Sequence, residues 1–369
     1  MTITEIILLS LISASVYIDL IILLFSVFIP ENRRDKKHSL LPDITILIVS
    51  RNEKDYIKSC LEGLENLDYP KEKIQIVIGD DESTDGTLDL IESYLSITPN
   101  SIIKSFNNIP TGLNPKAYIL NELISLSTGE YLFFTDANAV VPRNWVKTLL
   151  KGFDNTTGLV NGISLPRGKE NLFTSLQQCE WIFSQSLISS LGQIGFPSTA
   201  YGHNMCVSKE AYLNSGGFGK ELKDLTEDFT LSKNIYKQKY NIRFLRSKDT
   251  LVFKPAMQKL SKLIHQRLRW FTGAIKLPIW LVILNLLRWA LFPLSLVYIF
   301  LFDIYLGLGA LTIRILINIT LIKRASRKLK FNASLVGIIL YELYYFAVIL
   351  TILIAQFLRF KINWSERKY

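Results

Sequence analysis

Acidic residues stand at two points where an apolar run of the sequence ends. Asp80 and Asp81 follow Ile74–Ile78, and Asp136 follows Tyr131–Thr135 and opens the triplet Asp136-Ala137-Asn138. Adjacent carboxylates at the end of a buried strand repel each other, and a turn does not need them. Alternation along an extended segment places the oxygens of Asp136 and Asn138 on one side, which suits a hard divalent ion that bridges phosphates. The structural alternatives are a turn with Ser83 or Asp85 as a helix cap at the first point, and a turn before Pro142 at the second.

Two further segments carry residue types that bind or activate substrates. Thr226-Glu227-Asp228 precedes a helix predicted over 229–237, where Thr226 suits the N-cap and the two acids suit the helix dipole. His203, in Gly202-His203-Asn204-Met205, suits either substrate binding or simple packing. For these residues alone, structural and catalytic roles both remain open.

The motif Gln266-Arg267-Leu268-Arg269-Trp270 lies in an amphipathic stretch over residues 257–275. Gln266, Arg269 and Trp270 are three and four residues apart, so they share one helix face and offer an amide, a phosphate-binding fork and an aromatic platform. A helix resting in the lipid headgroup layer, with Arg and Trp as anchors, is the structural alternative.

The segments that must position these groups alternate between two patterns. Short β-branched runs at 44–49, 74–78, 102–106 and 131–135 alternate with helical stripes, among them 55–67 and 87–95. This alternation predicts an α/β domain with a mostly parallel sheet, over residues 31–256. Ligands of such sheets bind beyond the carboxyl ends of the strands, where Asp80, Asp81 and Asp136 stand.

Long apolar runs flank this domain. Residues 3–29 are interrupted only by Glu5 and Asp19, which predicts a membrane-spanning helix within 1–30; the run is too long for a signal peptide. Residues 278–322 predict two spans that turn near Phe302-Asp303, and 333–358 predict a third. The predicted organisation is a span in 1–30, the α/β domain in 31–256, an interface helix in 257–277 and a membrane region in 278–369.

Basic residues give conflicting signals about the side on which the chain ends. The runs 33–37 and 323–330 place the α/β domain in the cytoplasm by the positive-inside rule. A crossing over 333–358 would then export the tail, yet the tail also holds basic residues: Arg359, Lys361, Arg367 and Lys368. Either the tail is exported against the rule, or one segment between Pro278 and Leu358 is interfacial or re-entrant.

Composition excludes several classes of protein. The 369 residues are 49% hydrophobic and 20% charged, with a mean hydropathy of +0.24, which excludes a disordered chain. Of the net charge of +10, residues 276–369 carry +9 (twelve Lys and Arg against three acids), so the surplus flanks apolar segments and does not indicate nucleic acid. Three dispersed cysteines without a CxxC pair argue against a disulfide framework or a zinc ribbon.

Five motifs, taken in chain order, resemble the signature of membrane-bound family-2 glycosyltransferases. They are Ile48–Glu53, Asp80–Asp85, Asp136–Asn138, Thr226–Asp228 and Gln266–Trp270. The resemblance implies a GT-A fold and a nucleoside diphosphate sugar as donor, with Mg²⁺ or Mn²⁺ as cofactor.

The resemblance also implies residue roles. The nucleotide-sugar site would include Asp80, Asp81, Arg51, Lys116 and Asp136, with the metal at Asp136 and Asn138. Asp228 would be the general base, with Glu227 beside it. The diphosphate and the acceptor would contact Gln266, Arg269, Trp270, Asn204 and His203. One departure is Asn138, because the family's metal motif ends in Asp and an amide supplies less charge.

The expected activity is an inverting, metal-dependent sugar transfer to a lipid or lipid-linked acceptor at the cytoplasmic face of a bacterial or archaeal plasma membrane. A processive polysaccharide synthase is one alternative. A catalytically inactive membrane scaffold of the same fold is another. The sugar, the acceptor and the oligomeric state stay open at this stage.

Overall fold

The structure is a computed structural model that describes residues 2–28, 41–95, 100–196, 199–219, 222–360, 363–364 and 367–368. The basic run 33–37 lies outside the described residues. The chain divides into an α/β unit (Glu31–Arg167 and Leu191–Pro255) and a helical unit (Met1–Pro30, Gly168–Ser190 and Ala256–Tyr369). The domain boundaries predicted from the sequence stay a prediction, from which this division differs by grouping residues 168–190 with the helical unit.

A seven-stranded sheet forms the centre of the α/β unit, with strand order β3-β2-β1-β4-β7-β5-β8. The strands are β1 (Ile44–Ser50), β2 (Ile74–Asp81), β3 (Ser101–Phe106), β4 (Tyr131–Asp136), β5 (Thr157–Asn161), β7 (Asn204–Ser208) and β8 (Asn241–Phe244). Only β7 runs antiparallel to its neighbours. A small parallel sheet pairs β6 (Ile163–Arg167) with β9 (Leu251–Pro255). The predicted mostly parallel α/β fold is therefore confirmed.

Helices bury the sheet. They are α2 (Lys54–Glu65), α3 (Thr87–Leu95), α4 (Pro115–Ser125), α5 (Trp145–Leu150), α7 (Lys209–Ser215) and α8 (Glu227–Lys237). The α2 side chains of Ile57, Leu61 and Leu64 belong to the same core cluster as Ile46 and Ile48 of β1. Each such aliphatic side chain stabilises the fold by about 1.5–3 kcal/mol when fully buried. This packing holds the strand ends that carry the acidic residues.

Strand register brings those acidic residues to one edge. Val49 of β1 pairs with Asp136 of β4, and Ser50 of β1 pairs with Asp80 of β2. The end of β1 is therefore flanked by a carboxylate on each side. The sequence-based expectation that Asp80, Asp81 and Asp136 stand at the carboxyl ends of two parallel strands is confirmed, and β1 lies between these two strands.

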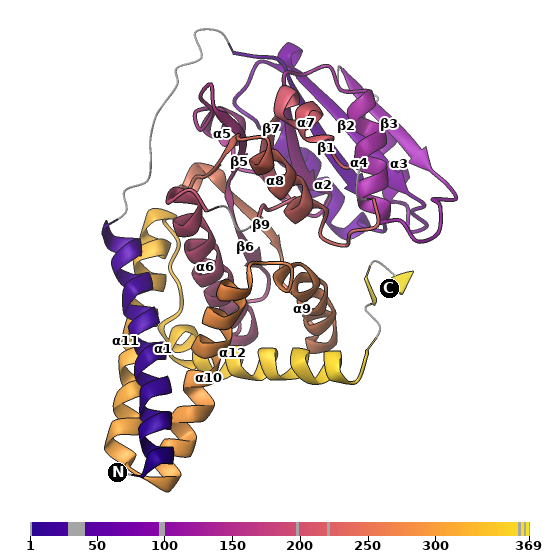
Figure 1. The fold of residues 1–369 in the computed structure, drawn as a ribbon. Coiled ribbons are helices and arrows are strands. Elements are labelled where there is room, and N and C mark those ends of the chain that lie inside the picture. The colour runs from indigo at the N-terminus through magenta and orange to yellow at the C-terminus, as the bar shows by residue number, and fades with distance from the viewer. Residues whose placement is uncertain are drawn as a thin grey trace. The chain divides into compact units, whose positions relative to one another are not determined.

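Among its described residues, the helical unit contains four helices long and apolar enough to span a membrane. They are α1 (Ile3–Phe28), α10 (Ile279–Leu301), α11 (Ile304–Lys328) and α12 (Leu335–Phe357). Asp303 caps α11 by accepting a hydrogen bond from the Leu306 N–H at 2.7 Å, which places the turn between α10 and α11 where the sequence predicted it. Figure 1 shows α1, α10 and α11 side by side and α12 crosswise to them. The unit also holds α9 (Leu260–Ala274) and most of α6 (Leu172–Gln193).

Four buried ionisable side chains meet inside this unit, one each from α1, α10, α11 and α12. We call Asp19, Arg288, Arg314 and Glu342 the membrane charge network. Arg288 Nε lies 2.7 Å from Asp19 Oδ1, Arg314 also pairs with Asp19, and Arg314 Nε lies 3.1 Å from Glu342 Oε2. Their side chains are at most 6% exposed. Two positive and two negative charges therefore neutralise each other.

Candidate active site

The loops after β1 and β2 are fastened together at the carboxyl edge of the sheet. Arg51 donates from Nη1 to the Asp81 backbone carbonyl at 2.9 Å, and the same nitrogen lies 3.6 Å from Asp81 Oδ1. The Thr84 N–H donates to Asn52 Oδ1 at 2.9 Å, and the Asn52 N–H donates to Ser83 Oγ at 3.0 Å. Asp81 is 4% exposed. The predicted nucleotide-site residues Arg51 and Asp81 thus touch each other.

Asp80 has internal partners instead. Its carboxylate accepts hydrogen bonds from Ser50 Oγ at 3.3 Å and from the Ser83 N–H at 3.0 Å, and the residue is 2% exposed. Asp85 accepts from the Thr87 N–H at 3.0 Å at the start of α3. The structural alternative drawn from the sequence is therefore correct for Asp85, and the contacts of Asp80 support the loop that carries Asp81.

Asp136 lies between two lysines. Lys116 Nζ is 2.7 Å from Asp136 Oδ1, and Lys254 Nζ pairs with Asp136 Oδ2. Burial alone would raise the pKa of the Asp136 carboxyl, but Lys116 and Lys254 hold it well below its usual range. The side chains of Lys116, Lys254 and Asp136 are 28%, 16% and 19% exposed. This cluster is accessible to a ligand.

Glu227 joins the same cluster from the start of α8. Its Oε1 lies 3.4 Å from Lys116 Nζ, and its Oε2 accepts a hydrogen bond from Asn114 Nδ2 at 3.0 Å. Asn114 also caps α4, since its side chain accepts from the Lys116 N–H at 3.0 Å. Because Glu227 is 5% exposed, its role in these contacts is to hold Lys116 in place.

Asn138 and Glu53 form a second pair beside Asp136. Asn138 Nδ2 donates to Glu53 Oε1 at 2.6 Å. Burial raises the pKa of Glu53 to about 7, while Lys254 opposes the rise. Asn138 Oδ1 is buried and has no hydrogen-bond partner among the described residues. It is an oxygen acceptor with no partner in that part of the chain.

The donor atoms at this edge fit a nucleotide-bound divalent ion. Mg²⁺ in such sites is held by one or two carboxylates together with substrate phosphates, not by a full protein cage. The Asp136 carboxylate and Asn138 Oδ1 match that donor set. In the described ranges no three His, Cys, Asp or Glu side chains gather as metal ligands, so an ion here would depend on the phosphates.

Asp228 is held from two sides and remains partly exposed. The Gly202 N–H donates to Asp228 Oδ2 at 2.9 Å, and the Phe229 N–H donates to Asp228 Oδ1 at 2.9 Å. Thr226 occupies the N-cap position of α8 without a side-chain cap bond; Asp224 instead accepts from the Thr226 N–H at 3.0 Å. The N-cap position expected for Thr226 is therefore confirmed, and its hydroxyl donates to Asp224 at 2.9 Å.

Asn204 and His203 differ in their surroundings. Asn204 is fully buried, accepts from Trp145 Nε1 at 2.8 Å, and donates to the carbonyls of Ile163 and Thr250 at 2.7 and 2.9 Å. These contacts give Asn204 a structural role, and we leave it out of the proposed site. His203 is half-buried and lowers the pKa of Asp136 through its charge, less strongly than the two lysines do.

The motif Gln266-Arg267-Leu268-Arg269-Trp270 lies on α9 of the helical unit, as predicted, and Arg267 is the residue that organises it. Arg267 Nε and Nη2 each lie 2.7 Å from a carboxylate oxygen of Glu180 on α6. Arg267 also donates to Gln266 Oε1, and its guanidinium carbon lies 4.3 Å from the centre of the Trp270 ring. An arginine has only donors, so Gln266 turns its oxygen to Arg267.

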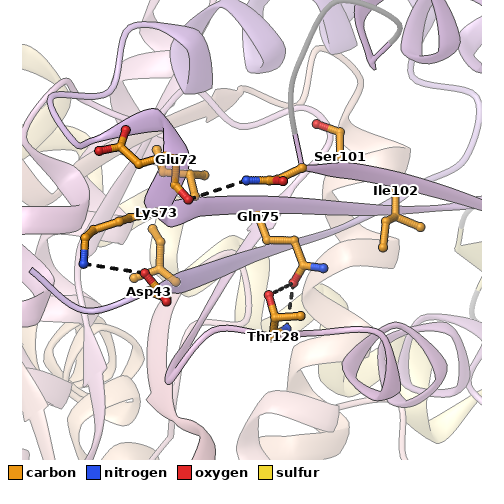
Figure 2. A pocket seen from close by; sticks show the side chains of 10 residues that line it. Asp43, Glu72, Lys73, Gln75, Ser101, Ile102 and Thr128 are labelled. Atoms are coloured by element: carbon orange, nitrogen blue, oxygen red, sulfur yellow. Dashed lines mark hydrogen bonds and ion pairs between the residues drawn. The ribbon is translucent and has the colours of Figure 1, made fainter.

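A pocket of about 400 Å³ opens at the opposite edge of the sheet. Ile44 and Ile74, the first residues of β1 and β2, line it together with Gln75. Figure 2 shows that its polar side chains bind one another: Lys73 Nζ lies 3.7 Å from Asp43, and Gln75 accepts from the Thr128 N–H at 2.8 Å. The candidate active site is therefore distinct from this pocket.

Sequence reasoning missed three residues of these clusters: Lys254, Glu53 and Glu180. Lys254 lies on β9, which pairs with β6 and bridges to Val140 through Phe253, and no short-range pattern in the sequence links this strand to Asp136. Glu53 closes the first of the five motifs, which could have marked it. Glu180 lies 87 residues from Arg267, and nothing local connects the two.

Comparisons with known proteins agree with these observations. The family model described as "Glycosyl transferase family 21" matches residues 6–369. The beta-monoglucosyldiacylglycerol synthase of Nostoc sp. (strain PCC 7120 / SAG 25.82 / UTEX 2576) is 27% identical over 268 residues, which are 69% of this chain and 54% of that protein. The probable glycosyltransferase YdaM of Bacillus subtilis (strain 168) is 28% identical over 249 residues, 66% of this chain and 58% of that protein. The chain thus spans about half the length of the curated relatives it matches.

A solved structure shares the fold. The mannosyltransferase from Pyrobaculum calidifontis, in complex with GDP-Man and Mn²⁺, superimposes with a TM-score of 0.60 at 18% identity, covering 95% of this chain and 98% of that one. At that identity the likeness concerns the fold alone. The GT-A fold expected from the sequence is confirmed.

Proposed function

Because the chain belongs to glycosyl transferase family 21, we propose that it transfers a sugar from a nucleoside diphosphate sugar to a lipid or lipid-linked acceptor, with inversion at the anomeric carbon. One observation carries the proposal: Asp136 is clustered with Lys116, Lys254 and Glu227 at the carboxyl edge of the sheet, and Asp228 follows Glu227 in the chain. Sheets of this kind bind their ligands at that edge.

The donor is held through its nucleoside and its diphosphate. Asp81 and Arg51 bind the nucleoside, and Asp80 supports their loop. Lys116 and Lys254 bind the diphosphate, because an ammonium group has three donors and can bind phosphate oxygens while it contacts Asp136. The partial exposure of both lysines supports this role.

Asp228 is the general base. It accepts the proton of the acceptor hydroxyl while that oxygen attacks the anomeric carbon, and the electron pair of the broken sugar–phosphate bond leaves with the nucleoside diphosphate. The N–H groups of Gly202 and Phe229 orient the carboxylate for this step. A single displacement inverts the anomeric configuration. The partial exposure of Asp228 supports contact with a substrate.

A divalent ion, Mg²⁺ or Mn²⁺, is part of the proposal. Asp136 and Asn138 would hold it together with the diphosphate oxygens, and the unpaired Asn138 Oδ1 supports this assignment. When bound, the ion supplies positive charge for the departing diphosphate. The mannosyltransferase of the same fold was solved with Mn²⁺, which is in keeping with this role.

The acceptor is a lipid or a glycan carried by a lipid. Within the helical unit, we assign acceptor binding to Gln266, Arg269 and Trp270 on α9. Within the α/β unit, His203 acts on the charge of Asp136. The four apolar helices and the name of the Nostoc relative, a beta-monoglucosyldiacylglycerol synthase, support a membrane-embedded acceptor. The basic stretch 323–330 supports a cytoplasmic α/β unit.

Transfer assays on the full chain test the proposal. The detergent-solubilised protein is incubated with diacylglycerol or an extract of host lipids and with radiolabelled UDP-glucose, UDP-N-acetylglucosamine or GDP-mannose. We expect one discrete labelled lipid with one of these donors. A ladder of products would indicate a processive synthase. Absence of both transfer and nucleoside diphosphate release with every donor would contradict the proposal and favour an inactive scaffold.

A further inference from the structure

Helix α12 differs in direction from the other apolar helices of the helical unit. Figure 1 shows α1, α10 and α11 side by side, whereas α12, the yellow helix near the C-terminus, runs crosswise to them. Spanning helices are tilted by roughly 0–40° from the bilayer normal. If α1, α10 and α11 are tilted within this range, α12, which runs crosswise to them, is not. Length and composition qualify α12 as a span, but its direction does not.

Specific contacts fix this crossing at the middle of α12. Glu342 accepts hydrogen bonds from Arg314 Nε and Asn318 Nδ2 of α11, each at 3.1 Å. The Phe346 ring stacks on Trp289 of α10, with ring centres 5.5 Å apart and an interplanar angle of 15°. Tyr344 donates to Glu180 of α6 at 2.7 Å. Because these anchors lie within a few residues of one another, α12 is held at one level of the bundle.

In α1 and α10 that level lies closer to one helix end than to the other, and in α11 Arg314 lies ten residues after the start of the helix and fourteen before its end. The membrane charge network, which includes Glu342, contains Asp19 nine residues before the end of α1 and Arg288 nine residues after the start of α10. Nine residues correspond to about 14 Å of helix. Both helix ends adjoin the parts of the chain that lead to the α/β unit or to α9. A helix in the membrane plane buries its apolar face roughly 5–10 Å into the boundary between headgroups and acyl chains.

The two faces of α12 suit an in-plane position. One face packs on the protein through residues such as Ile338, Tyr341 and Ile352, which are at most 3% exposed. The other face is apolar and exposed: Val336, Ile339, Leu343 and Ile354 are 58%, 43%, 54% and 50% exposed. Such a face needs acyl chains as its partner.

Charge on both sides of α12 supports the same position. Five basic residues precede it within 323–330, and four follow it, Arg359, Lys361, Arg367 and Lys368, against Glu366. Basic residues near the ends of membrane segments favour the cytoplasmic side. Two basic flanks therefore favour one side for both ends of α12, which a crossing helix does not allow.

We propose that α12 lies in the plane of the membrane, with its exposed apolar face docked into the acyl chains of one leaflet. In this arrangement the described part of the chain crosses the bilayer three times, through α1, α10 and α11. Both flanks of α12, the C-terminus and the α/β unit are on the same side. This inference is independent of the enzymatic activity.

Cysteine labelling of the full chain in membrane vesicles tests the topology. Thr2→Cys reports the side before α1, Lys151→Cys reports the α/β unit and Lys368→Cys reports the C-terminus. Native Cys60, Cys179 and Cys206 are buried and give a low background. With a membrane-impermeant maleimide, we expect Lys368→Cys and Lys151→Cys to react in the same vesicle orientation and Thr2→Cys in the opposite one. Reaction of Lys368→Cys together with Thr2→Cys would overturn the proposal.

Depth measurements along α12 give a second test, independent of the labelling experiment. Val336→Cys, Leu343→Cys and Ile354→Cys place a spin label at three points on the exposed face. Accessibility to oxygen and to a water-soluble relaxant should indicate similar depths at all three points if the helix lies in the plane. A profile that is deepest at Leu343→Cys and shallow at both ends would overturn the proposal.

Discussion

The two buried charge clusters of this molecule use different cations and serve different ends. Around Asp136 the cations are lysines with 28% and 16% of their side chains exposed. In the membrane charge network they are arginines at 0% and 3% exposure, each with several partners. An ammonium is a point charge that exchanges partners readily, whereas a guanidinium fits a fixed set of carboxylates. The comparison supports the proposal that the first cluster binds a ligand, whereas the second joins four helices to one another.

The substitution with the largest expected effect is Asp228→Asn, which should lower transfer activity without lowering stability. Loss of a general base typically costs ~10²–10⁴-fold in rate, while the fold and the nucleotide contacts remain. We expect transfer to fall by that factor, with an unchanged melting temperature and unchanged affinity for UDP or GDP measured by calorimetry. An active Asp228→Asn enzyme would remove Asp228 from the role of base.

Disrupting the membrane charge network should instead lower the stability of the protein. Arg314→Leu leaves Asp19 and Glu342 with fewer partners in an apolar interior, which typically costs about 3–5 kcal/mol. We expect a large loss of thermal stability in detergent. Arg327→Leu, an exposed position on the same helix, is the matched control and should change little. Equal stabilities for the two variants would mean that the network does not hold the helices together.

Removal of divalent ions tests whether Asp136 binds a metal ion in addition to its ion pairs with Lys116 and Lys254. We expect EDTA to lower transfer by about 100-fold, in line with the several kcal/mol that a metal ion contributes to stabilising a departing phosphate, and Mg²⁺ or Mn²⁺ to restore it. Asn138→Asp should restore activity at lower ion concentration, because it adds a charged ligand. Full transfer in EDTA would exclude the metal from the account.

Lys254→Met should weaken donor binding by about tenfold, the value of one charge-assisted hydrogen bond, with little change in melting temperature. The control is Lys147→Met, which removes an exposed lysine paired with Asp68 at 2.8 Å. Calorimetry with UDP and GDP measures the effect. If Lys254→Met and Lys147→Met both bind nucleotide as tightly as the wild type, the partly exposed Lys254 has no role in nucleotide binding.

The smallest expected effect is a pH dependence from Glu53. Its pKa rises from an ordinary 4.5 to about 7, mainly through burial, so the folded state holds a proton that the unfolded state has lost between these values. Stability should therefore fall as pH rises from about 4.5 to 7 and then level off, by on the order of 1 kcal/mol given partial exposure. Glu53→Gln should flatten this part of a melting-temperature profile. An identical profile of melting temperature against pH in Glu53→Gln would contradict the assignment of this pH dependence to Glu53.

Local sequence patterns predicted the elements well and the long-range partners poorly. Four strands, their order along the chain and the acidic residues at the ends of two of them followed from apolar runs, since buried parallel strands leave that signature. Lys254 beside Asp136, Glu180 beside Arg267 and the crosswise α12 did not, because tertiary packing decides which distant residues meet. The apolar character of α12 is the same for a spanning and an in-plane helix, so its direction and its two basic flanks must distinguish them.

The central claim is that the carboxyl edge of the sheet binds a nucleoside diphosphate sugar. Hydrogen exchange of the full chain, with and without UDP or GDP and Mn²⁺, compares the two edges of the sheet in one measurement. We expect protection at residues 50–54, 80–87, 114–117 and 136–138. Protection confined to the opposite edge, around Asp43, Gln75 and Thr128, would contradict the account.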